Sequence, residues 1–277
     1  MQRCQYRNSP HSAGPAKIIH KVMDAWRSAL VRSDATDTWI RGYEIAALMK
    51  RSTFAGTVFL LHAGRLPTDG EARVLDAILI AGSDGGVGSP SCAASRITAS
   101  ANRQSLSAAV AAGVLAIGEE PGGATSDCME AIQTIVSQAG SEYLPLVEAA
   151  RRYVEREREA GRRVPGLGHQ ARTQDPRVDA LFDLTNAEEL AGDGLAAMHA
   201  LQTAVARLIG PLPINIDGAL AAVLYDLGFP PAAGKLVFIV SRVAGLSAEA
   251  LEERTREQPM RIRIPVEYDG EGPRSIE

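Results

Sequence analysis

Residues 126–140 read Ser-Asp-Cys-Met-Glu-Ala-Ile-Gln-Thr-Ile-Val-Ser-Gln-Ala-Gly, and their apolar side chains recur at three- and four-residue spacing. That spacing puts Met129, Ile132 and Val136 on one face of an α-helix. Ser126 is of a type that caps helix N-termini, and Gly140 is of a type that ends helices. We therefore predict an amphipathic helix from Ser126 to Gly140.

Similar apolar spacing continues downstream. Further helices are expected at about residues 142–160, around 178–182, and at about 195–208 and 217–227. The run Leu236–Val240 is rich in β-branched residues and fits either a buried strand or a buried helix. Strands and helices alternate regularly nowhere else, which argues against a doubly wound α/β fold. We predict an all-α fold, and the abundance of alanine, the strongest helix former, agrees with it.

The overall composition is that of a water-soluble protein. The 277 residues are 45% hydrophobic and 22% charged, which is enough apolar material for one or two domains with a sizeable core. The net charge of -4 provides no basic field for nucleic acid or an anionic membrane. No apolar run approaches the roughly 20 residues of a membrane-spanning helix, and residues 1–14 lack the apolar centre of a secretory signal. We expect a cytoplasmic location.

The cysteines do not indicate a metal site. Cys4, Cys92 and Cys128 form no Cys-x-x-Cys pair, and the chain has only five histidines. A structural zinc site or a disulfide framework is therefore not expected.

Two glycine-containing loops interrupt the helical pattern, at residues 82–90 and 161–176. The first lacks the spacing of a nucleotide phosphate loop, so a turn that lets two backbones approach closely is the better interpretation. The second holds His169 and is followed directly by Arg177, and these two residues are either structural or part of an anion-binding site. Asp217 lies among apolar residues at a helix start, where it fits either a helix cap or a general base.

Five groups of residues, in the same order along the chain, resemble segments of the citrate synthase family. They are residues 40–68, residues 75–80 with 107–113, Pro121-Gly122-Gly123-Ala124, Gly166-Leu167-Gly168-His169 with Asp175-Pro176-Arg177, and Asn215-Ile216-Asp217 with residues 241–245. The resemblance covers about residues 39–261. The compact length and the Ile-Asp-Gly motif look most like citryl-CoA lyase and the matching module of ATP-citrate lyase.

The resemblance implies a two-domain helical homodimer. Residues 39–120 and 212–277 would form the large domain, residues 121–211 the inserted small domain, and residues 1–38 an N-terminal extension. Closure of the small domain would exclude water from the reaction. The dimer interface would lie within residues 76–112.

The resemblance also implies roles for single residues. Asp217 would take the α-proton of an acetyl thioester, and His169 would hold the oxygen of a keto acid. Arg177 and Arg242 would bind substrate carboxylates, which arginine forks match through two hydrogen bonds at a time. The chemistry needs such a base, together with a donor for the enolate oxygen.

Three further positions follow from the same resemblance. An arginine that reaches across the dimer matches Arg261 or Arg263. The backbone around Gly166 and Gly168 would border the coenzyme A channel. A coenzyme A thioester is then the substrate, and no metal is implied.

The chain departs from the family at two histidines. Pro121 stands where the family has a histidine that donates to the thioester carbonyl, and proline offers no donor. Loss of one such donor typically costs about two to three powers of ten in rate. Gly85 stands where the family has a second histidine that faces the substrate, and Ser89 and Ser91 are candidate replacement donors.

Three hypotheses follow. The first is a lyase that cleaves citryl-CoA, or a similar thioester, to acetyl-CoA and a 2-keto acid. The second is a citrate synthase, within tricarboxylic acid metabolism, that joins acetyl-CoA to oxaloacetate or another 2-keto acid. The third is a non-catalytic homologue that binds coenzyme A thioesters or organic acids.

Overall fold

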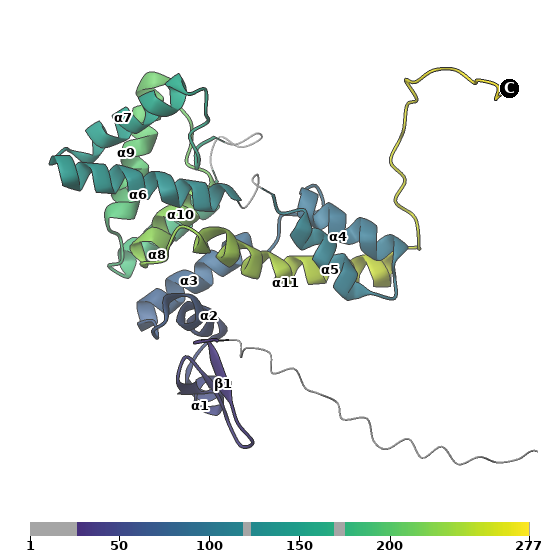
Figure 1. The fold of residues 1–277 in the computed structure, drawn as a ribbon, viewed down its shortest axis with the longest axis horizontal. Coiled ribbons are helices and arrows are strands. Elements are labelled where there is room, and N and C mark those ends of the chain that lie inside the picture. The colour runs from purple at the N-terminus through teal and green to yellow at the C-terminus, as the bar shows by residue number, and fades with distance from the viewer. Residues whose placement is uncertain (1–26, 119–122, 169–174, 277) are drawn as a thin grey trace, which may run out of the picture.

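The computed structural model describes residues 27–118, 123–168 and 175–276 (Figure 1). Within these ranges the chain forms eleven α-helices and one three-stranded sheet. The predicted all-α fold is therefore confirmed. The division into domains at residues 121 and 211 stays a prediction.

The small sheet opens the described chain. Its antiparallel strands are β1 (Val31–Ser33), β2 (Thr38–Ile40) and β3 (Tyr43–Glu44), in the order β1-β2-β3. Arg41 and Gly42 join β2 to β3 with φ angles of 49° and 87°, which suits a tight hairpin turn. Helix α1 (Ile45–Arg51) follows, and then α2 (Phe54–Ala63), which Thr53 caps by accepting from the N–H of Gly56.

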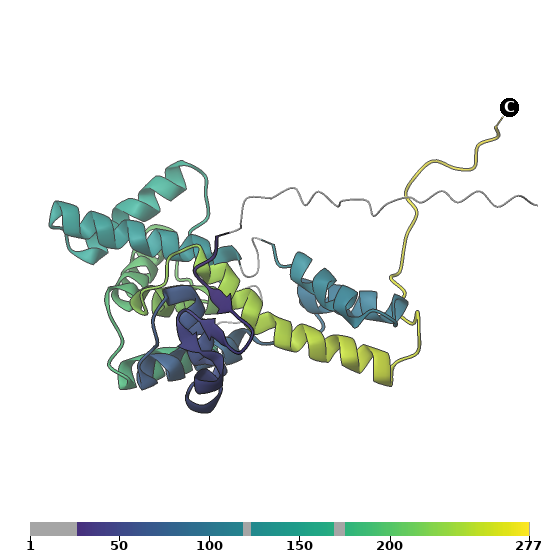
Figure 2. The same ribbon diagram turned by 60° about the horizontal axis from the view of Figure 1, so that its bottom comes forward.

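One group of helices forms an arm. These helices are α4 (Pro90–Ala101), α5 (Leu106–Leu115) and the C-terminal part of the 24-residue α11 (Ala233–Arg256), whereas α3 (Asp69–Gly82) packs on α2 outside the arm. Helices α4 and α5 pack on the C-terminal part of α11, and the three extend away from the rest of the molecule in both views (Figures 1 and 2). The N-terminal part of α11 contacts α3 and α6, which joins the arm to the body.

The remaining helices form a second group. They are α6 (Ala124–Glu142), α7 (Leu146–Glu159), α8 (Pro176–Ala187), α9 (Asp193–Leu208) and α10 (Ile216–Asp226). Helix α7 packs on α6 and α9, and the others contact α10. Every residue of α10 from 217 to 224 is buried, and α6, α8 and α9 contact it. The principal core cluster runs through these helices and also takes in α2 and α3.

The structure corrects some details of the predicted helices. Helix α6 begins at Ala124 with Gly123 as its N-cap, so Ser126 lies inside the helix, and its hydroxyl accepts from the backbone N–H of Lys235 at 2.9 Å. The helix also continues through Gly140 and ends at Glu142, and the C-cap Tyr143 takes the left-handed conformation with φ 55°. The run Leu236–Val240 is helical, inside α11. Among the described residues, no helix is long and apolar enough to cross a bilayer.

Candidate functional site

Asp217 lies in the first turn of α10. The N-cap is Asn215, whose side-chain oxygen accepts from the N–H of Gly218 at 3.0 Å, so the interpretation of Asp217 as the cap was wrong. Asp217 is 8% exposed, and one carboxylate oxygen, Oδ1, accepts from the hydroxyl of Thr125 at 2.7 Å. The partial positive charge of a helix N-terminus favours a carboxylate at this place. A buried carboxyl group held by a neutral donor is suited to exchanging protons.

Residues 166–168, in the second of the two glycine-containing loops and called the glycine loop below, lie directly against the start of α10. Gly166 O accepts from the N–H of Asn215 at 3.1 Å, and the N–H of Gly168 donates to Pro213 O at 2.8 Å. Both glycines have positive φ, of 81° and 87°. A Cβ on Gly166 would stand 2.9 Å from the Cα of Gly218, so only glycine lets these backbones touch.

This contact fixes where the loop leads. Asn215, which lies two residues before Asp217 in the chain, donates from its side-chain amide to Gly168 O at 3.0 Å. Gly168 is therefore held at the entrance of α10. His169 comes next in the sequence, and it lies outside the described residues.

Arg242 is a buried arginine on α11. It is 4% exposed, its Nε donates to Gly82 O at 2.8 Å, and its Nη1 donates to the hydroxyl oxygen of Ser91 at 3.1 Å. A buried guanidinium with a fixed orientation is suited to binding a carboxylate. Ser91, a candidate replacement donor from the sequence, thus accepts a hydrogen bond from Arg242.

The pKa of Arg242 reflects its surroundings. Burial lowers this pKa from its usual value, and the charge of Arg177 acts in the same direction. Cys92, Asp84 and Asp217 oppose the shift. Arg242 therefore lies within electrostatic reach of both Arg177 and Asp217.

Arg177 lies at the start of α8, beside Asp175. Its Nε and Nη2 donate to the Asp175 carboxylate at 2.9 and 2.6 Å, and Asp175 also caps α8 by accepting from the Arg177 N–H. The Arg177 side chain is 34% exposed. Its Nη1 donates to Ala81 O at 3.1 Å, one residue before the carbonyl that Arg242 contacts. The end of α3 thus brings Arg177 and Arg242 together.

Arg261 lies elsewhere in the same chain. It follows α11 and forms a two-bond ion pair with Glu253, at 3.0 and 2.6 Å. Eleven residues of helix separate Arg242 from Glu253, or about 16 Å at 1.5 Å per residue. Arg261 therefore does not join Asp217 within one chain, and a role across a dimer stays a prediction.

Gly85 borders Arg242. A Cβ on Gly85 would stand 2.8 Å from Nη1 of Arg242 and 2.7 Å from the hydroxyl of Ser89. The position is thus part of the surroundings of Arg242. Pro121 lies outside the described residues.

The residue that the sequence did not identify is Thr125. It directly follows Pro121-Gly122-Gly123-Ala124, but nothing in its local pattern points to Asp217. Only the packing of α6 on α10 brings the two side chains into contact across 92 positions of sequence.

One described cluster has potential metal-ligand atoms within 4.8 Å of one another: Asp84, Cys92 and Glu249. Glu249 pairs with Arg96, and Asp84 accepts from the backbone N–H of Gly86. Both carboxylates already have partners, so the cluster fits a polar network better than a cation site.

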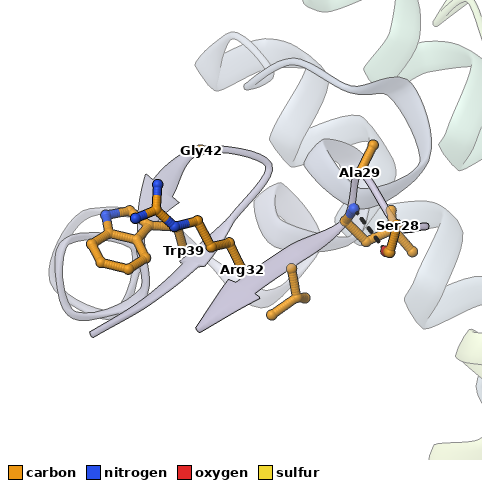
Figure 3. A pocket seen from close by; sticks show the side chains of 7 residues that line it. Ser28, Ala29, Arg32, Trp39 and Gly42 are labelled. Carbon is orange, nitrogen blue, oxygen red and sulfur yellow. Dashed lines mark hydrogen bonds between the residues drawn. The ribbon is translucent and has the colours of Figure 1, made fainter. Parts of the chain in front are cut away.

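A surface hollow lies beside the small sheet (Figure 3). It is lined by Ser28, Ala29, Leu30, Val31, Arg32, Trp39 and Gly42. The guanidinium carbon of Arg32 stands 5.0 Å from the centroid of the Trp39 ring. None of the predicted site residues lines this hollow.

Comparisons with known proteins place these features in context. The family model described as "Citrate synthase, C-terminal domain" matches residues 67–263. A curated citrate synthase from Deinococcus radiodurans is 27% identical over 238 residues, which is 83% of this chain. The chain spans only 59% of the length of that relative.

Solved structures extend the similarity. A citryl-CoA lyase from Hydrogenobacter thermophilus matches with a TM-score of 0.83 and 34% identity, over 91% of this chain and 97% of that one. An ATP citrate lyase from Methanosaeta concilii in complex with (3S)-citryl-CoA matches with a TM-score of 0.73 and 18% identity. That match covers 97% of this chain and 47% of the other, and it shows the fold alone.

Proposed function

The chain belongs to the citrate synthase family of enzymes, and from that premise we propose that it cleaves citryl-CoA or a similar thioester to acetyl-CoA and a 2-keto acid. The observation that carries this proposal is that Asp217, Arg177 and Arg242 share one electrostatic neighbourhood around the end of α3 and the start of α10. The similarity to a citryl-CoA lyase over almost the full length of both chains favours cleavage.

The arginines would bind the keto-acid part of the substrate. A citryl group carries two free carboxylates, and two fixed guanidinium groups offer matching hydrogen-bond donors. Arg242 is the more rigid of the two because Gly82 and Ser91 orient it in a buried place. Coenzyme A would run past the backbone of Gly166 and Gly168, as the family resemblance implies.

The proton transfers follow from the bond that breaks. The bond between the carbinol carbon and the CH2 next to the thioester gives its electron pair to that CH2, which becomes an enolate. The carbinol hydroxyl would give its proton to the neutral imidazole of His169, the residue expected beside this oxygen, and would thereby become the ketone. The carboxyl group of Asp217 then gives a proton to the CH2 carbon, and the product is acetyl-CoA.

The test is direct. Purified protein is mixed with citryl-CoA, and release of acetyl-CoA and of the keto acid is measured for the native chain and for Asp217→Asn. We expect the substitution to lower kcat by about two to four powers of ten, because it removes a general acid–base group. No acetyl-CoA from the native protein, or equal rates for both proteins, would contradict the proposal.

A second candidate is the synthase reaction, which the curated citrate synthase relative favours. Only a synthase hydrolyses the thioester, so acetyl-CoA plus oxaloacetate would then release free coenzyme A thiol. A third candidate is a binding protein without turnover, which the two departures at Gly85 and Pro121 favour. Calorimetric binding of coenzyme A thioesters without any product would identify it.

A further inference from the structure

We propose that Thr125 is a positioning residue that orients Asp217 for proton transfer, an inference that rests on the proposed function. The Thr125 side chain is fully buried, and its hydroxyl donates to Oδ1 of Asp217 at 2.7 Å. This hydrogen bond joins the first turns of α6 and α10.

The surrounding structure keeps Thr125 in place. The hydroxyl of the next residue, Ser126, accepts from the N–H of Lys235 at 2.9 Å, which ties the start of α6 to α11. A Cβ on Gly234 would stand 3.1 Å from the N of Ser126, so the two helices approach closely. The β-branched side chain of threonine adds stiffness because its χ1 angle has few accessible values in a helix.

The hydroxyl acts on Asp217 in two ways. A hydrogen bond to Oδ1 restricts rotation of the carboxylate and so aims it at one place, and small errors in such placement cost much rate. A donor to the ionised form also favours that form over the carboxylic acid. Thr125 brings this effect without a charge of its own.

Two titratable groups among the described residues interact with the charge of Asp217. Cys128, on α6, has its pKa raised by burial and further by the charge of Asp217, so its thiol stays protonated. Arg242, on α11, interacts with Asp217 through its charge. Neither group contacts the Thr125 hydroxyl through a described hydrogen bond, so a change at Thr125 acts on Asp217 first.

The experiment compares Thr125→Val, which loses the hydroxyl but keeps the shape, with Thr125→Ser, which keeps the hydroxyl. Two rates are measured across pH: cleavage of citryl-CoA, and exchange of the acetyl-CoA methyl protons with D2O in the presence of oxaloacetate. Exchange requires Asp217 to be ionised.

We expect Thr125→Val to slow exchange by roughly ten- to a hundredfold. Its acid limb should move up by about one pH unit, because the ionised carboxylate loses a donor. KM for oxaloacetate should stay within about twofold of the native value. Thr125→Ser should keep most of the native rate and the native pH profile.

A double-mutant comparison isolates the path through Asp217. In an Asp217→Asn background, Thr125→Val should add little further loss, because the two residues act as a unit. Equal exchange by native and Thr125→Val proteins, or an undiminished effect in the Asp217→Asn background, overturns the proposal. If Thr125→Val does not fold, Thr125→Ala replaces it, and failure of both to fold would assign Thr125 a structural role only and also overturn it.

The two proposals fail in different ways. A native protein that neither cleaves citryl-CoA nor exchanges the methyl protons overturns the proposed function, and this inference with it. A native protein that does both, but does not respond to Thr125→Val, overturns this inference alone.

Discussion

Two consecutive carbonyls at the end of α3 orient the two arginines of the site. Ala81 O accepts from Arg177 and Gly82 O accepts from Arg242. Carbonyls at a helix C-terminus carry partial negative charge and lack helical partners, so they suit cations. The same helix end therefore stabilises both guanidinium groups where a substrate carboxylate would bind.

Arg242→Lys tests this arrangement. Lysine keeps the charge, but its single ammonium group cannot reproduce the planar fork that contacts Gly82 and Ser91 together. We expect kcat/KM for citryl-CoA to fall by about two powers of ten, mainly through a higher KM. Arg207→Lys, at an exposed position of α9, is the matched control. An unchanged KM for Arg242→Lys would remove Arg242 from carboxylate binding.

Gly166→Ala tests the contact between the glycine loop and α10. The new Cβ would stand 2.5 Å from the sulfur of Cys128 and 2.9 Å from the Cα of Gly218, at a φ of 81°. Gly161→Ala is the control, because its φ is 67° and nothing lies within 4 Å. We expect about 1 kcal/mol of destabilisation from strain at Gly161, and about 2 kcal/mol or more, with lost activity, at Gly166. Equal losses in chemical denaturation would contradict the close contact.

At the scale of elements, α3 has the most complete N-terminus among the described helices. Thr68 caps it by accepting from the N–H of Glu71, and the Glu71 carboxylate accepts from the N–H of Thr68 at 2.8 Å. Hydrogen bonds from Arg65 lower the pKa of Glu71, burial opposes them, and the Thr68 N–H adds to the lowering. This capping box fixes the helix whose other end holds the two arginines.

Glu71→Gln should therefore have a pH-dependent effect. Because the pKa of Glu71 is lower in the folded chain than in the unfolded one, its charge stabilises the fold above the unfolded value and loses this effect as pH falls through the folded value. We expect Glu71→Gln to lose about 1 kcal/mol near pH 7, since Arg65 is half exposed and its ion pair is modest. Urea titrations at several pH values should show the difference shrinking in acid. A constant difference would contradict the assignment.

The helices were predictable to the extent that their signals are local. Apolar spacing identified α6, but its start was wrong, since the helix begins at Ala124 and the Ser126 hydroxyl bonds to Lys235, more than a hundred positions away. Gly140 was expected to end the helix, but it lies inside α6, and the chain leaves the helix only at Tyr143. The run Leu236–Val240 could not be assigned from its β-branched residues, since burial suits strand and helix equally. The role of Thr125 could not be predicted for a similar reason, since its partner Asp217 lies on another helix.

At the scale of the whole molecule, hydrogen bonds, close packing and ion pairs among its own helices stabilise the arm. The hydroxyl of Ser95 on α4 donates to Leu246 O on α11 at 3.0 Å, and Gly113 on α5 gives the Leu246 side chain room to pack. Arg96 pairs with Glu249 and, at 3.7 Å, with the fully buried Glu253. These contacts order the arm, yet apolar side chains stay exposed on it: Ile97 at 43%, Leu115 at 85% and Leu251 at 52%.

Exposed apolar side chains on an ordered arm are what a second copy of the chain could cover, and Ile97 falls inside the predicted interface at residues 76–112. We expect light scattering to give the native protein a molar mass of twice the 29.4 kDa of one chain. Ile97→Glu should weaken the dimer by about thirtyfold or more, because it places a charge in an apolar contact. Met49→Glu is the matched control, since Met49 is 79% exposed on α1, outside the arm. A native monomer at micromolar concentration, or equal effects of both substitutions, would show that the arm does not form the interface.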